Sequence, residues 1–244
     1  NRAENILARG AHPHQKSASL DIYYETLCPD SLKLLSGTFS QFWSDTEISQ
    51  HFSVRLVPSG NAEVVPEESV SAGYHFWHPN SRYPLVLCQH GQSECLGNLI
   101  QACAIDLLKS PDKYVPFVIC MASYGTRSSV EMSSYDCGHK LGIDVDQIKT
   151  CTESERGYHL LMANARESQD PKLNRTYVPF IRINGEHAKL DDGESILAPL
   201  CGVLAIPKPP GCKARVKAEE EGHAGGRGGC SESGKGGGSG EGFF

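Results

Sequence analysis

The sequence predicts an α/β domain with a large helical insertion and several disulfide bonds. Three observations support this fold class. Near the N-terminus, the hydrophobic pattern predicts two strands with an amphipathic helix between them, and this helix begins at a cysteine. Far downstream, a strand, an Asn-Gly turn, a further strand and a helix follow one another. Between these two blocks the spacing of apolar residues is mostly helical.

The first block begins with a strand expected over 19–24 and leads into Cys28 and Pro29. Proline suits the first position of a helix, because its missing N–H is not needed there, so Cys28 should lie at or beside the N-cap. We expect one amphipathic helix after it, because four apolar residues recur at spacings of three and four: Leu32, Leu35, Phe39 and Phe42. Alternation over 52–57 predicts the second strand, which ends at Pro58.

The second block contains a strand over 180–183, a hairpin turn at Asn184-Gly185 and a strand over 187–190. A closing helix should follow, with Pro199 kinking it or delaying its start. Its apolar side would be formed by Ile196, Leu197, Leu200, Cys201 and Leu204. The order of strand, cysteine-led helix, strand, insertion, hairpin and helix is that of a thioredoxin-like fold.

The domain is expected over residues 18–206, with the helical insertion at about 59–176. Within the insertion, periodicity predicts helices around 96–107, 144–151 and 157–165. Residues 1–17 are polar and aperiodic, so we expect a flexible lead-in. From 207 to 244 the composition changes, and from Lys208 onward it includes 12 of the 25 glycines. Such a Gly-rich tail should be disordered, because it cannot bury enough apolar surface to offset its ordering entropy.

Composition restricts the compartment and the partners. Ten cysteines in 244 residues indicate an oxidising environment, so the secretory pathway is expected, in the lysosome or outside the cell. Asn174 begins an Asn-Arg-Thr glycosylation sequon, which agrees with that route. A net charge of −6 argues against a nucleic-acid partner. No run approaches the roughly 18 apolar residues of a membrane span, and the start lacks a Met or an apolar signal core, so we expect a soluble chain whose signal peptide has been removed.

Cys28 is the candidate nucleophile, since the oriented N–H groups of a helix N-terminus favour thiolate over thiol. In a dithiol site the cysteine three positions later resolves the mixed disulfide, but this sequence has Ser31 there. Negative charge on Glu25 and Asp30 would oppose the thiolate. From this motif alone, a buried or disulfide-bonded Cys28 remains as reasonable as a reactive one.

A thioredoxin-like site also needs a proline, and two similar segments offer one, Pro116 and Pro179. We choose Pro179, because strand, turn and strand follow it at once, whereas no hairpin signal follows Pro116.

The most specific motif, C-Q-H-G-x2-E-C-x2-N-x4-C, spans 88–103. It consists of Cys88, Gln89, His90, Gly91, Glu94, Cys95, Asn98 and Cys103. It resembles the signature of the gamma-interferon-inducible lysosomal thiol reductase family, and further similar segments extend the resemblance over about 18–205. The resemblance implies a thioredoxin-like fold with a helical insertion, an active-site C-x-x-C pair, and reduction of protein disulfides in acidic endosomes and lysosomes.

By this resemblance Cys28 is the first active-site cysteine and Pro179 the cis-proline that faces it. Ser31 takes the second position and departs from the family pattern. Cys88, Cys95 and Cys103 would form the structural framework of the insertion. An alternative is a zinc site made of three sulfurs and one imidazole, although its spacing is unusual and oxidising surroundings favour disulfides. The candidate ligands are Cys88, His90, Cys95 and Cys103.

The sequence thus predicts a thiol–disulfide oxidoreductase that reduces disulfide-bonded protein substrates through Cys28, without an organic cofactor or metal. An external thiol such as glutathione, or a tail cysteine, would resolve the mixed disulfide. The tail candidates are Cys212 and Cys230, because a free Cys28 leaves nine other cysteines and at least one of them unpaired within the chain. The alternative is a redox-inactive thioredoxin-fold protein that binds or retains its clients.

Overall fold

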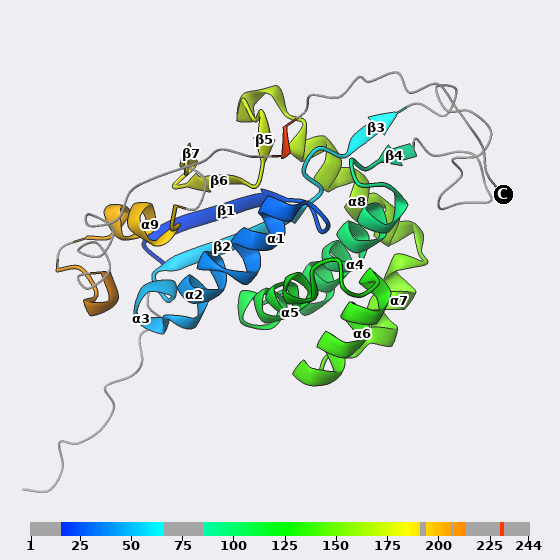
Figure 1. The fold of residues 1–244 in the computed structure, drawn as a ribbon, viewed down its shortest axis with the longest axis horizontal. Helices are drawn as coiled ribbons and strands as arrows, with labels where there is room; N and C mark the ends of the chain where they lie inside the picture. Colours follow the sequence, from blue (N-terminus) through cyan, green and yellow to red (C-terminus); the bar gives the residue numbers. More distant parts are fainter. Residues whose placement is uncertain (1–15, 66–84, 191–193, 206, 213–229, 232–244) are drawn as a thin grey trace, which may run out of the picture.

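The computed structural model describes residues 16–65, 85–190, 194–205, 207–212 and 230–231. Its centre is a four-stranded sheet with the strand order β2-β1-β6-β7 (Figure 1). The parallel pair is β1 (Ala18–Tyr24) and β2 (Phe52–Pro58). Antiparallel to β1 lies β6 (Phe180–Ile183), followed by β7 (Glu186–His187). With its crossover helices and terminal hairpin, this arrangement confirms the predicted thioredoxin-like fold.

The connection between the parallel strands contains three helices instead of the single one expected. They are α1 (Pro29–Ser36), α2 (Thr38–Ser44) and α3 (Thr46–Ser49). The break falls at Gly37, whose φ and ψ of −100° and −108° are not helical. The predicted apolar face survives the break, since Leu35, Phe39 and Phe42 are all buried. Hydrophobic spacing therefore located the buried face, but it did not show that the helix is interrupted.

The C-terminal block follows the prediction with small shifts. Asn184 and Gly185 have φ values of 53° and 82°, as a tight hairpin turn with two left-handed residues requires. Strand β7 begins one residue earlier than expected and is shorter. The closing helix is α9 (Leu197–Val203), and its five predicted apolar residues are buried. Pro199 lies in the first turn, where its missing N–H costs no intrahelical hydrogen bond.

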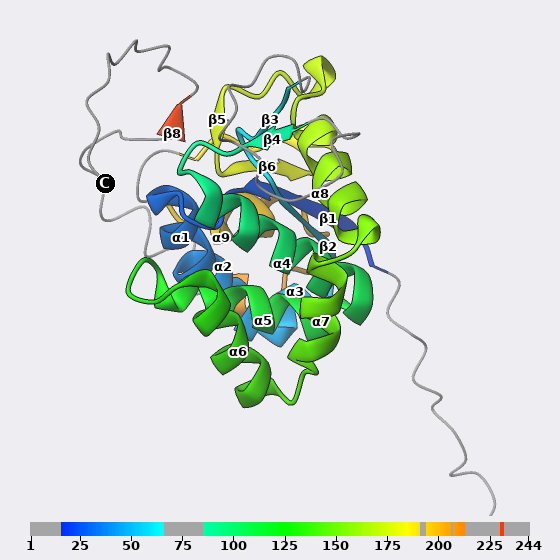
Figure 2. The same ribbon diagram turned by 90° about the vertical axis from the view of Figure 1, so that its right-hand side faces the viewer.

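The insertion forms a helical layer beside the sheet (Figure 2). After β3 (Glu63–Val65) and β4 (Leu85–Leu87) it contains five α-helices and a 3-10 turn, Pro171–Leu173. The helices are α4 (Gln92–Leu108), α5 (Pro111–Tyr124), α6 (Val130–Leu141), α7 (Val145–Thr152) and α8 (Glu155–Ser168). Of these, α4, α7 and α8 match predicted helices, whereas α5 and α6 were not expected.

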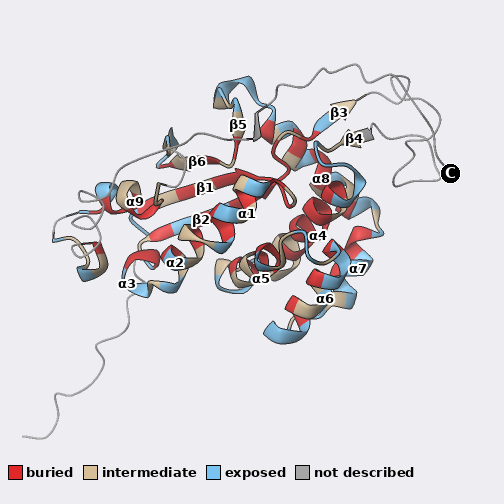
Figure 3. Ribbon diagram, in the orientation of Figure 1, coloured by how far each residue is buried: buried red, intermediate tan, exposed pale blue. Residues whose placement is uncertain are grey.

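Two buried clusters hold the layers together, and they appear as the red faces of the ribbon in Figure 3. The larger lies between the sheet and helices α1, α2, α5 and α9. The second lies among the helices of the insertion, from α4 to α8. Helix α5 contributes to both clusters, with Val118 in the first and Phe117 in the second. This shared helix joins the insertion to the thioredoxin-like part as one packed unit.

Four disulfides reinforce this unit: Cys88–Cys95, Cys103–Cys151, Cys120–Cys137 and Cys201–Cys212. The second joins α4 to α7, and the third joins α5 to α6. The zinc interpretation is therefore wrong, because the sulfurs of its three cysteines are bonded to other sulfurs and offer no thiolate.

The packed region extends past the tail boundary predicted at residue 207. Cys212 is 1% exposed and belongs to the larger core cluster, held there by its bond to Cys201. Farther along, Cys230–Ser231 forms the short strand β8, which pairs with β5 (Tyr177–Val178), so this part of the tail is not disordered as predicted. The rest of the tail and residues 1–15 lie outside the described residues. Among the described helices, none combines the length and apolarity that a bilayer span requires.

Candidate active site

Cys28 stands at the start of α1, as the Cys-Pro pair predicts. It is the N-cap residue, Pro29 occupies the first turn, and the Leu32 amide donates to the Cys28 carbonyl at 2.9 Å. The side chain of Cys28 is fully buried and its sulfur is in a disulfide. Of the states that the motif left open, the structure shows the oxidised one. Exchange with a substrate therefore requires that this disulfide is first reduced.

Ser31 lies one turn into the same helix and is also fully buried. The backbone N–H of Glu25 donates to its Oγ at 3.2 Å. Residues three apart on a helix are neighbours, so Ser31 sits where a dithiol site would place its second sulfur. A hydroxyl there satisfies a buried amide, but it cannot form a disulfide.

The loop that leads to Cys28 is held by two residues of the signature motif. Asn98 accepts from the Thr26 amide through Oδ1 at 3.1 Å, and Glu94 accepts from the Leu27 amide through Oε2 at 3.3 Å. The Thr26 hydroxyl also donates to the Glu94 carbonyl at 3.1 Å. This close approach requires Gly97, because a Cβ there would lie 2.4 Å from the Thr26 hydroxyl. The motif therefore positions the backbone directly before the candidate nucleophile.

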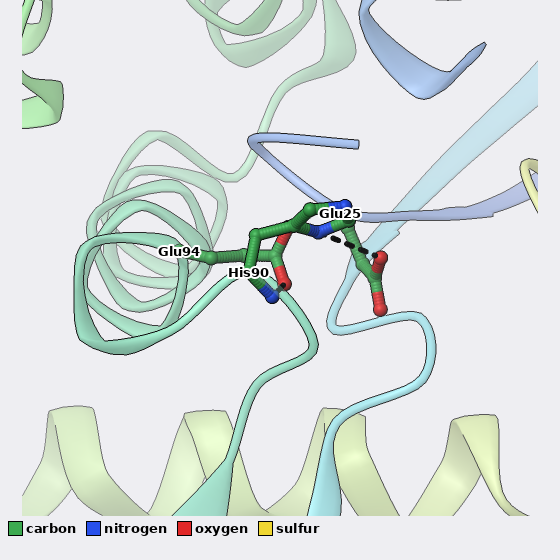
Figure 4. A group of neighbouring side chains, drawn as sticks. All are labelled: Glu25, His90 and Glu94. Carbon is green, nitrogen blue, oxygen red and sulfur yellow. Dashed lines mark hydrogen bonds and ion pairs between the residues drawn. The ribbon is translucent and has the colours of Figure 1, made fainter. Parts of the chain in front are cut away.

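Glu94 also binds His90, and Glu25 lies beside them (Figure 4). The Oε1 atom of Glu94 accepts from the His90 amide at 3.0 Å, while Oε2 lies 2.6 Å from His90 Nδ1. Glu25 Oε2 is 3.6 Å from the same nitrogen. Ligand atoms of the three residues lie within 4.8 Å of one another, a spacing that could surround a cation. Because both oxygens of Glu94 already accept hydrogen bonds, the geometry fits a carboxylate–imidazole cluster better than a metal site.

Glu25 itself is buried under the turn that follows β2. Its Oε1 accepts from the Asn61 amide at 2.6 Å. Gly60 has a φ of +50°, and a Cβ there would lie 2.3 Å from the Glu25 side chain, so only glycine leaves room for it. Burial, and then the charge of Glu94, raise the pKa of Glu25 from 4.5 to about 8. Glu25 is therefore neutral in an acidic compartment, and the expected opposition of its charge to a Cys28 thiolate is absent there.

This buried acid predicts a pH-dependent stability. Between pH 4.5 and 8 the folded protein keeps the Glu25 proton while the unfolded chain releases it, so stability falls as the pH rises through this window. His90, Glu94 and Arg175 are the titratable or charged groups that lie near the same carboxyl. We expect a loss on the order of 2 kcal/mol from pH 5 to pH 8, measured by urea denaturation. Glu25→Gln should flatten this dependence.

The matched control is Glu47→Gln, a substitution at an exposed glutamate on α3, which should keep the dependence of the parent protein. An unchanged slope in Glu25→Gln would show that another group titrates in this window.

The other signature residues surround this cluster. Gln89 accepts from the Asn61 side chain through Oε1 at 2.7 Å. Gly91 is the N-cap of α4, with a φ of 81° and a ψ of −167° that residues with a side chain rarely adopt. Cys88, Cys95 and Cys103 lie in the disulfides described above.

Pro179 lies at the same end of the sheet as Cys28. The antiparallel register pairs Tyr23 with Phe180, which places Pro179 beside the end of β1, where the loop to Cys28 begins. The Val178–Pro179 peptide bond is cis. Val178 is fully buried and belongs to β5, whose backbone pairs with β8. Asn174 is exposed, at the end of the 3-10 turn, and its glycosylation stays a prediction.

Sequence reasoning did not find the support that Glu25 and Asn61 give to this site. In the sequence Glu25 stands out only as a charge near Cys28, and no local pattern singles out Asn61. Their roles depend on contacts across 36 residues, for which no local spacing gives a signal.

Comparison with known proteins agrees with this geometry. The sequence profile of the family "Gamma interferon inducible lysosomal thiol reductase" matches residues 19–141. A protein of that name from Carassius auratus is 30% identical over 207 residues, which cover 82% of this chain and 73% of the relative. The namesake from Mus musculus is 25% identical over 218 residues, covering 87% and 79%.

Solved structures support the fold alone. The oxidised form of BdbD from Bacillus subtilis has a TM-score of 0.50 at 14% identity, over 72% of this chain and 81% of that one. Reduced DsbA from Mycobacterium tuberculosis has a TM-score of 0.50 at 12% identity, over 87% and 94%. With the profile match and the relative from Carassius auratus, the chain belongs to the gamma interferon inducible lysosomal thiol reductase family.

Proposed function

We propose that this thiol–disulfide oxidoreductase reduces the disulfides of protein substrates with Cys28 as its nucleophile. Ser31, the other end of the C-x-x-S motif, takes no part in the exchange. The observation that carries the proposal is the position of Cys28 as N-cap of α1, with Ser31 buried one turn later. Once reduced, Cys28 attacks a substrate sulfur and forms a mixed disulfide, which Ser31 cannot resolve. Resolution then needs a further thiol, such as glutathione.

Two features support a reactive thiolate at acidic pH. Cys28 is the N-cap of α1, and the positive end of a helix dipole favours the thiolate form of a cysteine placed there. The neighbouring Glu25 is held neutral by burial, so it adds no opposing charge there. The substrate backbone would lie against Val178 and Pro179, at the sheet end that Cys28 shares.

The lysosome or another part of the secretory pathway is the proposed compartment. The relatives from Carassius auratus and Mus musculus are named lysosomal thiol reductases. Four disulfides agree with an oxidising route, and the exposed Asn174 is available for a glycan. Proteins with intact disulfides are the proposed substrates.

The test is glutathione-supported reduction of a disulfide-bonded protein at pH 5 and pH 7, with Cys28→Ala beside the parent. We expect the alanine variant to fall to the uncatalysed rate at both pH values. A Ser36→Ala variant, altered at an exposed position of α1, should keep full turnover and serves as the control. Equal rates for the parent and Cys28→Ala would favour a redox-inactive binding protein instead.

A further inference from the structure

The bonded state of Cys28 identifies a second cysteine of interest. The chain has ten cysteines, and the four described disulfides use eight of them. Cys28 is itself in a disulfide within a structure that contains a single chain. Besides Cys28, Cys230 is the one cysteine of the sequence that these four bonds leave over.

The backbone of the tail independently places this residue at the site. In the pairing of β5 with β8, Val178 lies opposite Cys230 and Tyr177 lies opposite Ser231. Val178 directly precedes the cis Pro179, where we expect a substrate strand to bind. A short segment of the protein's own tail thus forms the backbone pairing that an extended substrate would form.

We propose that Cys230 is both the disulfide partner of Cys28 and its resolving cysteine, carried on a tail strand that binds as an internal substrate. The proposal rests on the proposed function of Cys28. Cys230 would supply the sulfur that Ser31 lacks, although it lies far along the chain from Cys28 and not three residues after it. The proposal also explains why Cys28 is fully buried in the oxidised protein.

The electron balance of the cycle is complete. The Cys28 thiolate attacks one sulfur of a substrate disulfide, forms a mixed disulfide and releases the other sulfur as a thiolate, which takes a proton from water. The Cys230 thiolate then attacks the Cys28 sulfur, and the second substrate thiol leaves. Two electrons have passed from the Cys28/Cys230 pair to the substrate. Two equivalents of an external monothiol, or one dithiol, reduce the pair again and are oxidised to a disulfide.

The tether makes this resolution intramolecular. Cys212 is buried and bonded to Cys201, so the tail is anchored 18 residues before Cys230. A thiol on so short a connection has a high effective concentration at the site, on the order of millimolar for short tethers. Resolution by Cys230 should therefore exceed resolution by dilute glutathione.

The first test is peptide mapping of the full chain after free thiols have been blocked with iodoacetamide. We expect one peptide pair in which the segment with Cys28 is linked to the segment with Cys230. After mild reduction, both cysteines should take up the label. A Cys28 that is linked to any other residue, or that is labelled before reduction, would overturn the proposal.

The second test compares Cys230→Ser with the parent protein at limiting glutathione. We expect turnover to fall about tenfold or more, and the variant to accumulate a mixed disulfide between Cys28 and the substrate. Ser233→Ala is the matched control, because it alters the same tail without removing a sulfur. High concentrations of dithiothreitol should restore the variant, since a dithiol can resolve the intermediate from solution.

The two proposals fail in different ways. If Cys28→Ala removes turnover while Cys230→Ser is as fast as the parent or faster, only the resolving role of Cys230 is wrong. If Cys28→Ala retains full turnover, the proposed function itself is wrong.

Discussion

Replacing Glu94 by alanine should lower the free energy of unfolding by about 2–4 kcal/mol, the largest loss that we expect from a single polar residue here. Its carboxylate is fully buried and accepts the amides of His90 and Leu27, which belong to two different segments. Removing it leaves both donors without their acceptor in a region that water hardly reaches. Urea denaturation at pH 5 measures the effect.

Two variants separate the hydrogen bonds of Glu94 from its charge. Glu94→Gln keeps one carbonyl oxygen but turns an NH2 group toward a donor, so we expect a smaller loss than for alanine. Glu131→Ala removes an exposed glutamate at the start of α6 and should change stability by less than about 0.5 kcal/mol. If Glu94→Ala were as stable as Glu131→Ala, Glu94 would not hold the loop in solution.

Glu94→Ala should also slow the reaction, in addition to lowering the stability of the fold. Through Leu27, Glu94 fixes the backbone directly before Cys28, so its loss should move the nucleophile relative to the helix N-terminus. Without urea, and at a temperature where the variant is fully folded, we expect a lower kcat. We also expect its pH–rate profile to shift toward higher pH. Such a shift would mark Glu94 as a positioning residue, because a merely structural role would leave the profile unchanged.

The parts of the fold that were predictable are those with local signals. The Cys-Pro pair located the N-cap of α1, and Asn184-Gly185 located the hairpin turn. Helix α5 gave no such signal, because Pro116 interrupts its pattern in mid-helix. Helix α5 is held by its disulfide from Cys120 to α6 and by two buried clusters, all of which are tertiary effects.

The site was predictable in its residues but not in its connections. The signature motif identified Glu94 and Asn98, yet only the fold shows that they hold the loop at Thr26 and Leu27. Disulfide pairing likewise cannot be deduced from spacing, since many connectivities are possible for ten cysteines. Composition predicted a disordered tail, because a strand of two residues such as β8 has no pattern of its own and depends on β5.

Restoring a sulfur at position 31 should raise turnover by about tenfold or more when glutathione is limiting. Ser31 lies one turn after Cys28 at the start of α1, the position that the second cysteine of a C-x-x-C pair occupies. In Ser31→Cys the new thiol would attack the mixed disulfide without any movement of the tail. The measurement is reduction of a disulfide-bonded protein, with Ser31→Ala as the control.

The control isolates the sulfur from the hydrogen bond. Both variants weaken or remove the bond from the Glu25 amide to Ser31, at a cost of about 1 kcal/mol, so only the sulfur distinguishes their rates. We expect Ser31→Ala to match the parent or fall slightly below it. If Ser31→Cys were no faster than Ser31→Ala, resolution of the mixed disulfide would not limit the cycle.

Combining Ser31→Cys with Cys230→Ser tests whether the two sulfurs perform the same step, the resolution of the mixed disulfide. If Cys230 resolves the intermediate in the parent protein, its removal should cost about tenfold there and almost nothing once position 31 carries a thiol. This non-additivity is the signature of two groups that serve one step. A tenfold loss in both backgrounds would instead assign Cys230 a task other than resolution. The comparison thus decides whether the tail strand replaces the second cysteine of the helix.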